Sequence, residues 1–104
     1  MASTIAQTSL SNATTGTGAT VDFLVAKKTV TAVLVAGGTI AKGVVTIEAS
    51  QDSVNWVALS HLALDQGVNV AASFAGQAYR YWRASVAVDL AGGGKVAVTF
   101  MEAD

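Results

Sequence analysis

The sequence predicts an all-β fold, an antiparallel β-sandwich built from six to eight short strands. Three observations support this prediction. From residue 21 onward, apolar residues recur with a period of two, as expected where one face of each strand is buried. Turn-forming residues interrupt the chain at spacings of ~8–12 residues, which is typical of sandwiches and barrels. Valine and threonine, whose branched side chains suit a pleated surface, are common between those turns.

The first two predicted strands are 21–25 and 29–35. In the first, Val21, Phe23 and Val25 alternate with their neighbours, and two lysines then mark a turn. The second begins with alternating threonine and valine and stops at a pair of glycines.

The third strand, 43–50, shows the clearest alternation. A strand with one buried face places every second side chain inward. The residues predicted to face inward are Val45, Ile47 and Ala49, and those predicted to face outward are Thr46, Glu48 and Ser50.

The fourth strand is predicted at 56–62, and here a helix is the alternative. Leu59, Leu62 and Leu64 have a loosely helical spacing over 57–67, and Asn55 could cap such a helix. Both interpretations remain open from the sequence.

Three further strands are predicted at 68–74, 79–89 and 95–101. The first follows an Asp-Gln-Gly turn, and the last follows three glycines that begin at Gly92. These glycines lack the Lys-Ser/Thr ending and the following helix of a phosphate-binding loop, so we interpret them as a turn.

Residues 1–20 differ from the remainder of the chain. The segment from Ser3 to Thr20 is rich in Ser, Thr, Ala and Gly and carries no charge, so it has little to bury by itself. We expect either a flexible terminus or an arm that orders on a neighbouring subunit, with 21–104 as the sandwich domain. The arm residues expected to contact that neighbour are Thr4, Ile5 and Leu10.

The composition indicates a surface with few charges. Only 12% of the 104 residues are charged, against about 25% in an average soluble domain. A small domain has a large surface for its volume, so much of this surface must be uncharged and partly apolar. Such a surface has two explanations. The protein is either a monomer with Ser and Thr on its surface, or a subunit whose surface is covered by other copies of the chain or by another lattice. We expect the second, a homo-oligomer.

Several partners and cofactors are not expected. The basic residues are scattered, so no stripe predicts binding to nucleic acid. No apolar stretch approaches the ~18 residues of a membrane helix, and the residues after Met1 do not resemble a signal peptide. The chain has no cysteine, which excludes disulfides and thiolate metal sites. We therefore predict no cofactor.

The segment from Ser50 to Trp56 is the most specific local pattern. Asp52 can accept hydrogen bonds from backbone N–H groups two residues on, which shapes a tight turn, and Asn55 tolerates positive φ. Trp56 is then expected to enter the next strand and bury its ring in the core. The alternative is a ligand loop, in which Asp52 contacts a carbohydrate or a metal. One carboxylate cannot supply the six to eight oxygens of a calcium site.

A second pattern combines aromatic and basic residues between Tyr79 and Arg83. Strict alternation would place Tyr79, Tyr81 and Arg83 on one face, and Arg80 and Trp82 on the other. Such a face could stack a base or a sugar. We favour a core strand with arginines at its margin, because no second basic cluster supports a groove.

These two motifs, the spacing Ser-x-Asp-x-x-x-Trp and then Tyr-Arg-Tyr-Trp-Arg-x-x-Val, resemble small phage virion proteins with a β-sandwich. More loosely, they resemble discoidin-type jelly rolls. The resemblance covers roughly 44–100 and implies a jelly-roll-like sandwich. Many members have Gly after the aspartate, where this chain has Ser53.

Catalysis has few candidate residues. A Ser-His-Asp triad would have to use His61, the single histidine, and no nucleophile-elbow pattern exists. The seven acidic residues are dispersed. We therefore expect His61 to be structural and the chain not to be an enzyme.

The resemblance and the composition together predict a virion structural protein, made in the host cytoplasm. The leading expectation is a capsid decoration (cement) protein that binds the major capsid protein lattice as a homo-oligomer, with a trimer suited to local threefold axes. One alternative is a tail or fibre module. Another is a carbohydrate-binding module that uses Trp56, Tyr79 or Tyr81.

Overall fold

The computed structural model describes residues 6–23, 29–64, 70–75 and 79–103. This part of the chain is all-β, as predicted, and it contains no helix long and apolar enough to cross a membrane. The strands are β1 (Ala6–Ala13), β2 (Val21–Asp22), β3 (Thr29–Gly37), β4 (Lys42–Ser50), β5 (Val57–Ala63), β6 (Val70–Ala75), β7 (Tyr81–Ala91) and β8 (Lys95–Ala103).

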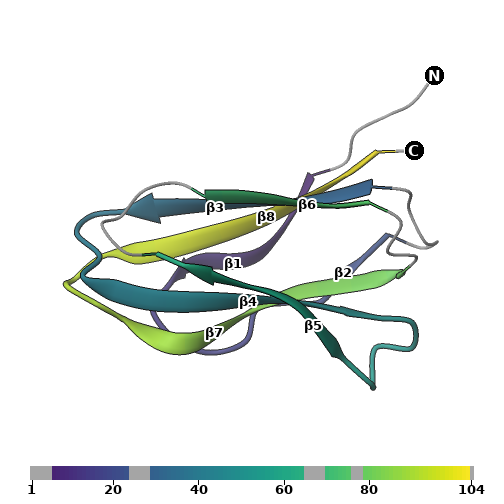
Figure 1. The fold of residues 1–104 in the computed structure, drawn as a ribbon, viewed down its shortest axis with the longest axis horizontal. Coiled ribbons are helices and arrows are strands. Elements are labelled where there is room, and N and C mark those ends of the chain that lie inside the picture. Colours follow the sequence, from purple (N-terminus) through teal and green to yellow (C-terminus); the bar gives the residue numbers. More distant parts are fainter. Residues whose placement is uncertain (1–5, 24–28, 65–69, 76–78, 104) are drawn as a thin grey trace.

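The strands form two antiparallel sheets that pack face to face (Figure 1). Sheet A has the order β1-β8-β3-β6, and sheet B has the order β2-β7-β4-β5. The antiparallel pairs β1/β8, β2/β7, β3/β6 and β4/β5 nest within one another along the chain. This nesting is the topology of a jelly roll, which the sequence resemblance implied.

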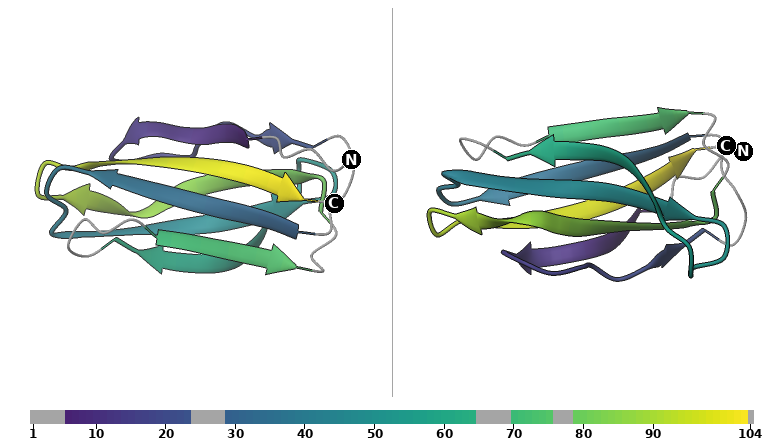
Figure 2. Two further views of the ribbon diagram at one scale, coloured as in Figure 1. Left: turned by 90° about the horizontal axis from the view of Figure 1, so that it is seen from above. Right: turned by 60° about the horizontal axis from the view of Figure 1, so that its bottom comes forward.

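The long axes of the strands run along the molecule in both layers (Figure 2). The start of β1 and the end of β8 lie side by side, with Ala6 opposite Met101. The ends of the described domain therefore lie together at one end of the sandwich.

The core follows the predicted alternation. On β4, Val45, Ile47 and Ala49 are fully buried between the sheets, as predicted. Trp82 of β7 is also fully buried, and its ring centroid lies 5.5 Å from that of Phe74 and 6.1 Å from that of Phe100. Aromatic rings at these separations attract one another beyond their area burial.

The first described residues belong to the sandwich rather than to an arm outside it. Strand β1 forms one edge of sheet A, and Leu10 is only 5% exposed. Ser9 is buried as well: its hydroxyl donates to the Ala19 carbonyl at 2.8 Å and accepts from the Ala84 N–H at 3.0 Å. The bulged register of β1 obscured its alternation in the sequence. Thr4 and Ile5 lie outside the described residues.

The chain between β1 and β2 follows the free edge of β7. The Gly18 N–H donates to the Ala84 carbonyl, and the Val86 N–H donates to the Gly16 carbonyl, both at 2.8 Å. A β-carbon at Gly18 would collide with the Ser9 carbonyl, so this close approach requires glycine. Residues 14–20 thus join the two sheets along one side of the sandwich.

Residues 57–63 form the edge strand β5, so the helix considered for 57–67 is not present in its described part. The register with β4 shifts between Ile47, which faces Ser60, and Glu48, which faces Ala58. The extra residue at this bulge is Leu59, and it changes the phase of the alternation. The bulge therefore explains the leucine spacing that suggested a helix.

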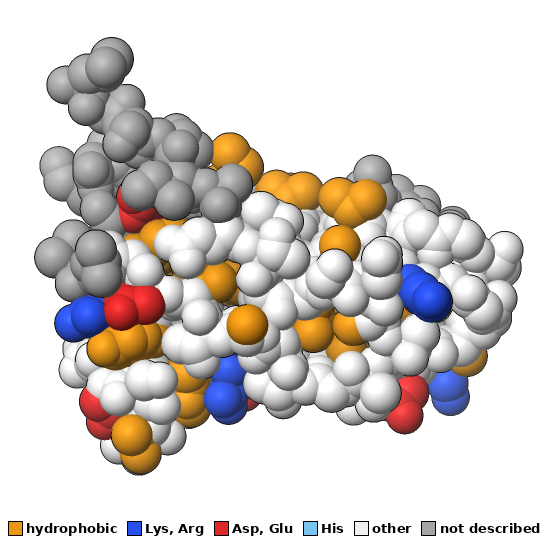
Figure 3. All heavy atoms as spheres, turned by 180° about the vertical axis from the view of Figure 1, so that it is seen from behind, with side chains coloured by type: hydrophobic (Ala, Val, Ile, Leu, Met, Phe, Trp, Pro, Cys, Tyr) orange, Lys and Arg blue, Asp and Glu red, His pale blue; other side chains and the backbone are white. Residues whose placement is uncertain are grey.

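The surface carries few charges over wide areas. In Figure 3, uncharged and apolar groups dominate the face that is shown, and charged side chains are scattered among them. The prediction of a weakly charged surface is therefore confirmed for the described part of this face.

Candidate functional site

The loop between β4 and β5 is organised around Asp52. Its Oδ1 accepts hydrogen bonds from the N–H groups of Val54, at 2.9 Å, and Asn55, at 2.8 Å. Its Oδ2 accepts from the side-chain amide of Asn55 at 2.9 Å. On the other side, the hydroxyl of Ser50 donates to Oδ1 and accepts from the N–H of Ser53. The predicted aspartate turn is present in this form.

This network favours the charged form of Asp52. The hydrogen bonds from the backbone of Asn55, the backbone of Val54 and the side chains of Asn55 and Ser50 hold the pKa of Asp52 well below its usual range. The carboxylate is exposed, but its acceptor positions already serve the loop. Its function in this loop is therefore to fix the backbone.

The backbone of the turn differs from the expectation in one position. Ser53 has φ +64°, whereas Asn55 is not among the described residues with positive φ. The position after the aspartate, where the resembling proteins have Gly, thus keeps a left-handed conformation with serine in it. A non-glycine residue there is uncommon, and the hydrogen bond from its N–H to Ser50 supports it.

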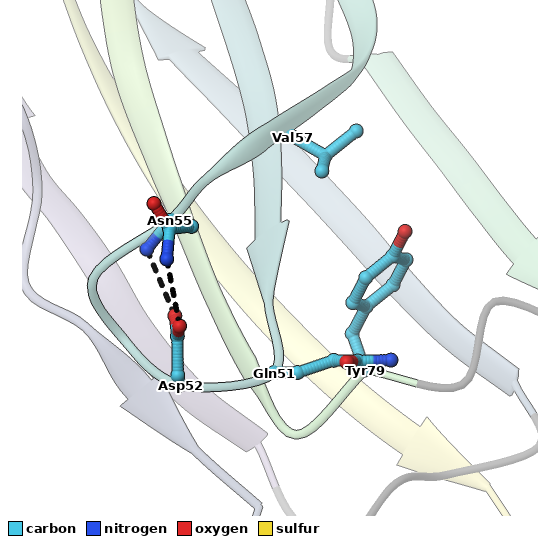
Figure 4. A pocket seen from close by; sticks show the side chains of 5 residues that line it. All are labelled: Gln51, Asp52, Asn55, Val57 and Tyr79. Carbon is cyan, nitrogen blue, oxygen red and sulfur yellow. Dashed lines mark hydrogen bonds between the residues drawn. The ribbon is translucent and has the colours of Figure 1, made fainter.

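The loop forms one wall of an open pocket of about 360 Å³. Its lining residues are Gln51, Asp52, Asn55, Val57 and Tyr79 (Figure 4). In this view the carboxylate of Asp52 points toward Asn55, and the ring of Tyr79 extends toward Val57. The pocket therefore offers one aromatic ring, one valine, two carboxamides and the carboxylate of Asp52, a set that suits a ligand with hydroxyl groups.

Tyr79 is placed there by the core. The Trp82 indole N–H donates to the Tyr79 carbonyl at 3.0 Å, and the two rings meet edge to face with centroids 6.3 Å apart. Strand β7 begins at Tyr81, two residues after Tyr79, so the strict alternation predicted for 79–83 does not extend to Tyr79.

The guanidinium of Arg80 covers Tyr81. Arg80 forms a two-point ion pair with Asp22, with distances of 2.7 and 2.9 Å, and this pairing raises the pKa of Arg80. Its central carbon lies 4.9 Å from the ring centroid of Tyr81. Arg80 therefore lies on the same side of the sheet as Tyr81. Strict alternation had predicted it on the side of Trp82, and that prediction is wrong.

The same arrangement recurs at Trp56. Arg83 donates from Nε to Glu48 at 2.6 Å, and its central carbon lies 4.0 Å from the ring centroid of Trp56. Trp56 is half-buried on the outer face of sheet B and not in the core, where the sequence pattern predicted it; Trp82 is the tryptophan that fills the core. Two of the three rings considered for sugar stacking, Trp56 and Tyr81, thus have one face covered by arginine.

His61 lies on β5 opposite Thr46, and its Nδ1 is 2.8 Å from the Thr46 hydroxyl. Thr46 is buried beneath it. Among the residues that the structure describes, no group of three or more His, Cys, Asp or Glu side chains is placed to hold a metal ion.

The different positions of the two tryptophans predict different losses of stability. Trp82→Ala removes a fully buried ring, so we expect the free energy of unfolding to fall by about 3–5 kcal/mol. Trp56→Ala removes a partly buried ring with one cation–π contact, so we expect a loss of about 1 kcal/mol. Denaturant unfolding of the two variants measures both values. Equal losses would contradict the assignment of Trp82 as the core residue.

The lowered pKa of Asp52 predicts a dependence on acid. A carboxyl whose pKa is lower in the folded state contributes stability above its unfolded pKa, about 4, and loses that contribution as the pH falls further. We expect the melting temperature of the wild type to exceed that of Asp52→Asn above about pH 5, with the difference shrinking below about pH 4. Thermal melts from pH 2 to 7 test this. Parallel curves for the two proteins would show that the turn does not depend on the charge.

Comparison with known proteins gives matches in structure and not in sequence. No family model and no curated protein matches the chain. Among solved structures, the SPBc2 prophage-derived protein YomS is similar over 100% of this chain and 96% of its own, with a TM-score of 0.73 and 11% identity. The PBSX exported protein XepA is similar over 99% of this chain, with a TM-score of 0.69 and 14% identity. The chain spans 38% of XepA. At these identities the likeness shows a shared fold.

Proposed function

We propose that this chain is a structural protein of a bacteriophage particle, and specifically a capsid decoration protein that binds the lattice of the major capsid protein. The observation that carries the proposal is the match of the whole sandwich to YomS, a protein of prophage origin by its description. The motifs around Asp52 and Trp82 point to the same class through their resemblance to small phage virion proteins.

The surface supports a role in assembly. Five large hydrophobic side chains of the described residues are well exposed, namely Val35, Val54, Val57, Val88 and Met101. On a surface with few charges overall, such groups favour contact with another protein surface over isolation in water. In this proposal the protein acts by burying surface, as a homo-oligomer on the capsid, and a trimer would suit the local threefold axes of a capsid.

A tail or fibre module is the second form of the proposal. The likeness to XepA favours it, because there the same fold accounts for only 38% of the chain. A sandwich that occurs within a longer chain can serve as one module of an extended assembly. The two forms differ in location on the particle and not in fold.

The proposal predicts that the protein is a stoichiometric component of purified particles. Mass spectrometry of gradient-purified phage, produced from the genome that encodes this chain, should detect it at a ratio near that of other structural proteins. Immunogold labelling should then place it on the head for a decoration protein and on the tail for the alternative. Absence from purified particles would overturn both forms.

The pocket beside Tyr79 supports a different function, carbohydrate binding. Its ring and the carboxamides of Gln51 and Asn55 are groups that bind neutral hydroxyl-bearing ligands. This function predicts a glycan that binds on an array and whose binding is lost in Gln51→Ala. Lys42→Ala, at the opposite end of β4, is the matched control and should bind as the wild type does. An array without binding removes this function.

A further inference from the structure

We propose that the outer face of sheet A is the surface through which copies of this chain contact one another. This inference rests on the proposed homo-oligomer and assigns its self-contact to one face of the sandwich.

The register of sheet A gathers its outward side chains into an uncharged array. The strands β3, β6 and β8 are paired residue by residue, so their outward positions align across the sheet. Lys95, at the start of β8, is the one charged residue among the described outward positions of these three strands, and it lies at the margin. The central positions of the array are Thr31, Val33, Ala71, Ser73, Thr99 and Met101.

The polar groups of this face partly satisfy one another. The hydroxyls of Thr31 and Ser73 lie 3.0 Å apart, within hydrogen-bond distance. Burying a hydroxyl costs little where its hydrogen bond is kept. Val35 and Met101, on the same face, remain 49% and 38% exposed, so apolar area is available to bury.

The outer face of sheet B is a poorer candidate for self-contact. It carries the ion pair of Glu48 with Arg83, whose guanidinium also covers Trp56. Covering such a group removes charges from water, and their mutual attraction does not reliably offset that cost. The two faces of one sandwich therefore differ in what association with an uncharged surface would cost.

Charge decides which partner fits the array. A face without central charges cannot form ion pairs, so it suits a partner surface that is also uncharged. The chain carries such a surface itself, and two copies that meet there bring no like charges together at the centre of the contact. A second copy is therefore the occupant that we assign.

The size of the face is compatible with this assignment. The three strands of the array extend into β1, the edge strand that pairs with β8 and carries no charged residue. Four strands about 4.8 Å apart, each six to nine residues long at about 3.3 Å per residue, form a patch of roughly 400–550 Å². Two such patches bury roughly 800–1,100 Å², which includes the roughly 1,000 Å² that a specific interface needs. We therefore expect reversible association that depends on protein concentration.

The test introduces charge at two exposed positions of the array. In Ser73→Glu/Met101→Glu, carboxylates flank Thr31 on both sides, so copies that meet there would repel one another. The matched control is Ala63→Glu/Ala87→Glu, which adds the same charge at exposed positions of β5 and β7 in sheet B. Sedimentation velocity over a range of concentrations measures the oligomeric state, and thermal melting confirms that each variant is folded.

We expect the wild type and the control to associate, and the sheet A variant to associate at least about tenfold more weakly. Val35→Lys, at the far end of the same face, gives a second reading if the double variant does not fold. A wild type that is monomeric at all concentrations, or a sheet A variant that associates like the wild type, would overturn the inference. A monomer that is nevertheless present in purified particles would leave the proposed virion role in place. An oligomer that is absent from purified particles would support the self-contact and overturn the proposed virion role.

Discussion

The indole of Trp82 fills the space between the two sheets, and the arrangement of the neighbouring elements depends on it. Phe74 and Phe100 pack against it from sheet A. An indole N–H that is buried without an acceptor costs free energy, so the chain before β7 must present a carbonyl group, which Tyr79 does. That requirement holds the Tyr79 ring at the margin of the core, where it lines the pocket beside the Asp52 turn. The packing of Trp82 in the core therefore also determines where Tyr79 lies in the pocket.

The burial of Trp82 also determines what β7 presents to solvent. Because successive strand residues face opposite sides, Arg83 must point outward when Trp82 points inward. The register of β7 with β4 then places Arg83 opposite Glu48, and the pair lies beside Trp56. The outer face of sheet B consequently carries an ion pair and a stacked arginine, whereas the central outward positions of sheet A carry no charge.

Much of the fold could be predicted from the sequence, because a period of two requires no knowledge of partners. The predicted inward set on β4 is confirmed, and the strand predicted at 29–35 appears as β3. Two features could not be predicted from the sequence of one strand, because they depend on how that strand pairs and packs with others. The alternation of β1 is broken by its bulged register with β8, and the faces of Trp56 and Trp82 depend on which sheet surface is buried. The Asp52 turn was predictable because its hydrogen bonds are local, whereas the pocket was not, since Tyr79 reaches it from a distant part of the chain.

The domain has few charged residues, and where they lie bears on the proposed assembly. In this chain, Asp22 with Arg80 and Glu48 with Arg83 engage four charged side chains in pairs on one side of the molecule. Charges that are already paired contribute little to the repulsion that keeps like molecules apart, and the other sheet has none at its centre. The proposed self-contact through sheet A would cover the apolar area that Val35 and Met101 leave exposed. In this proposal no change in the fold is needed, because the register of sheet A already aligns the uncharged positions across its strands.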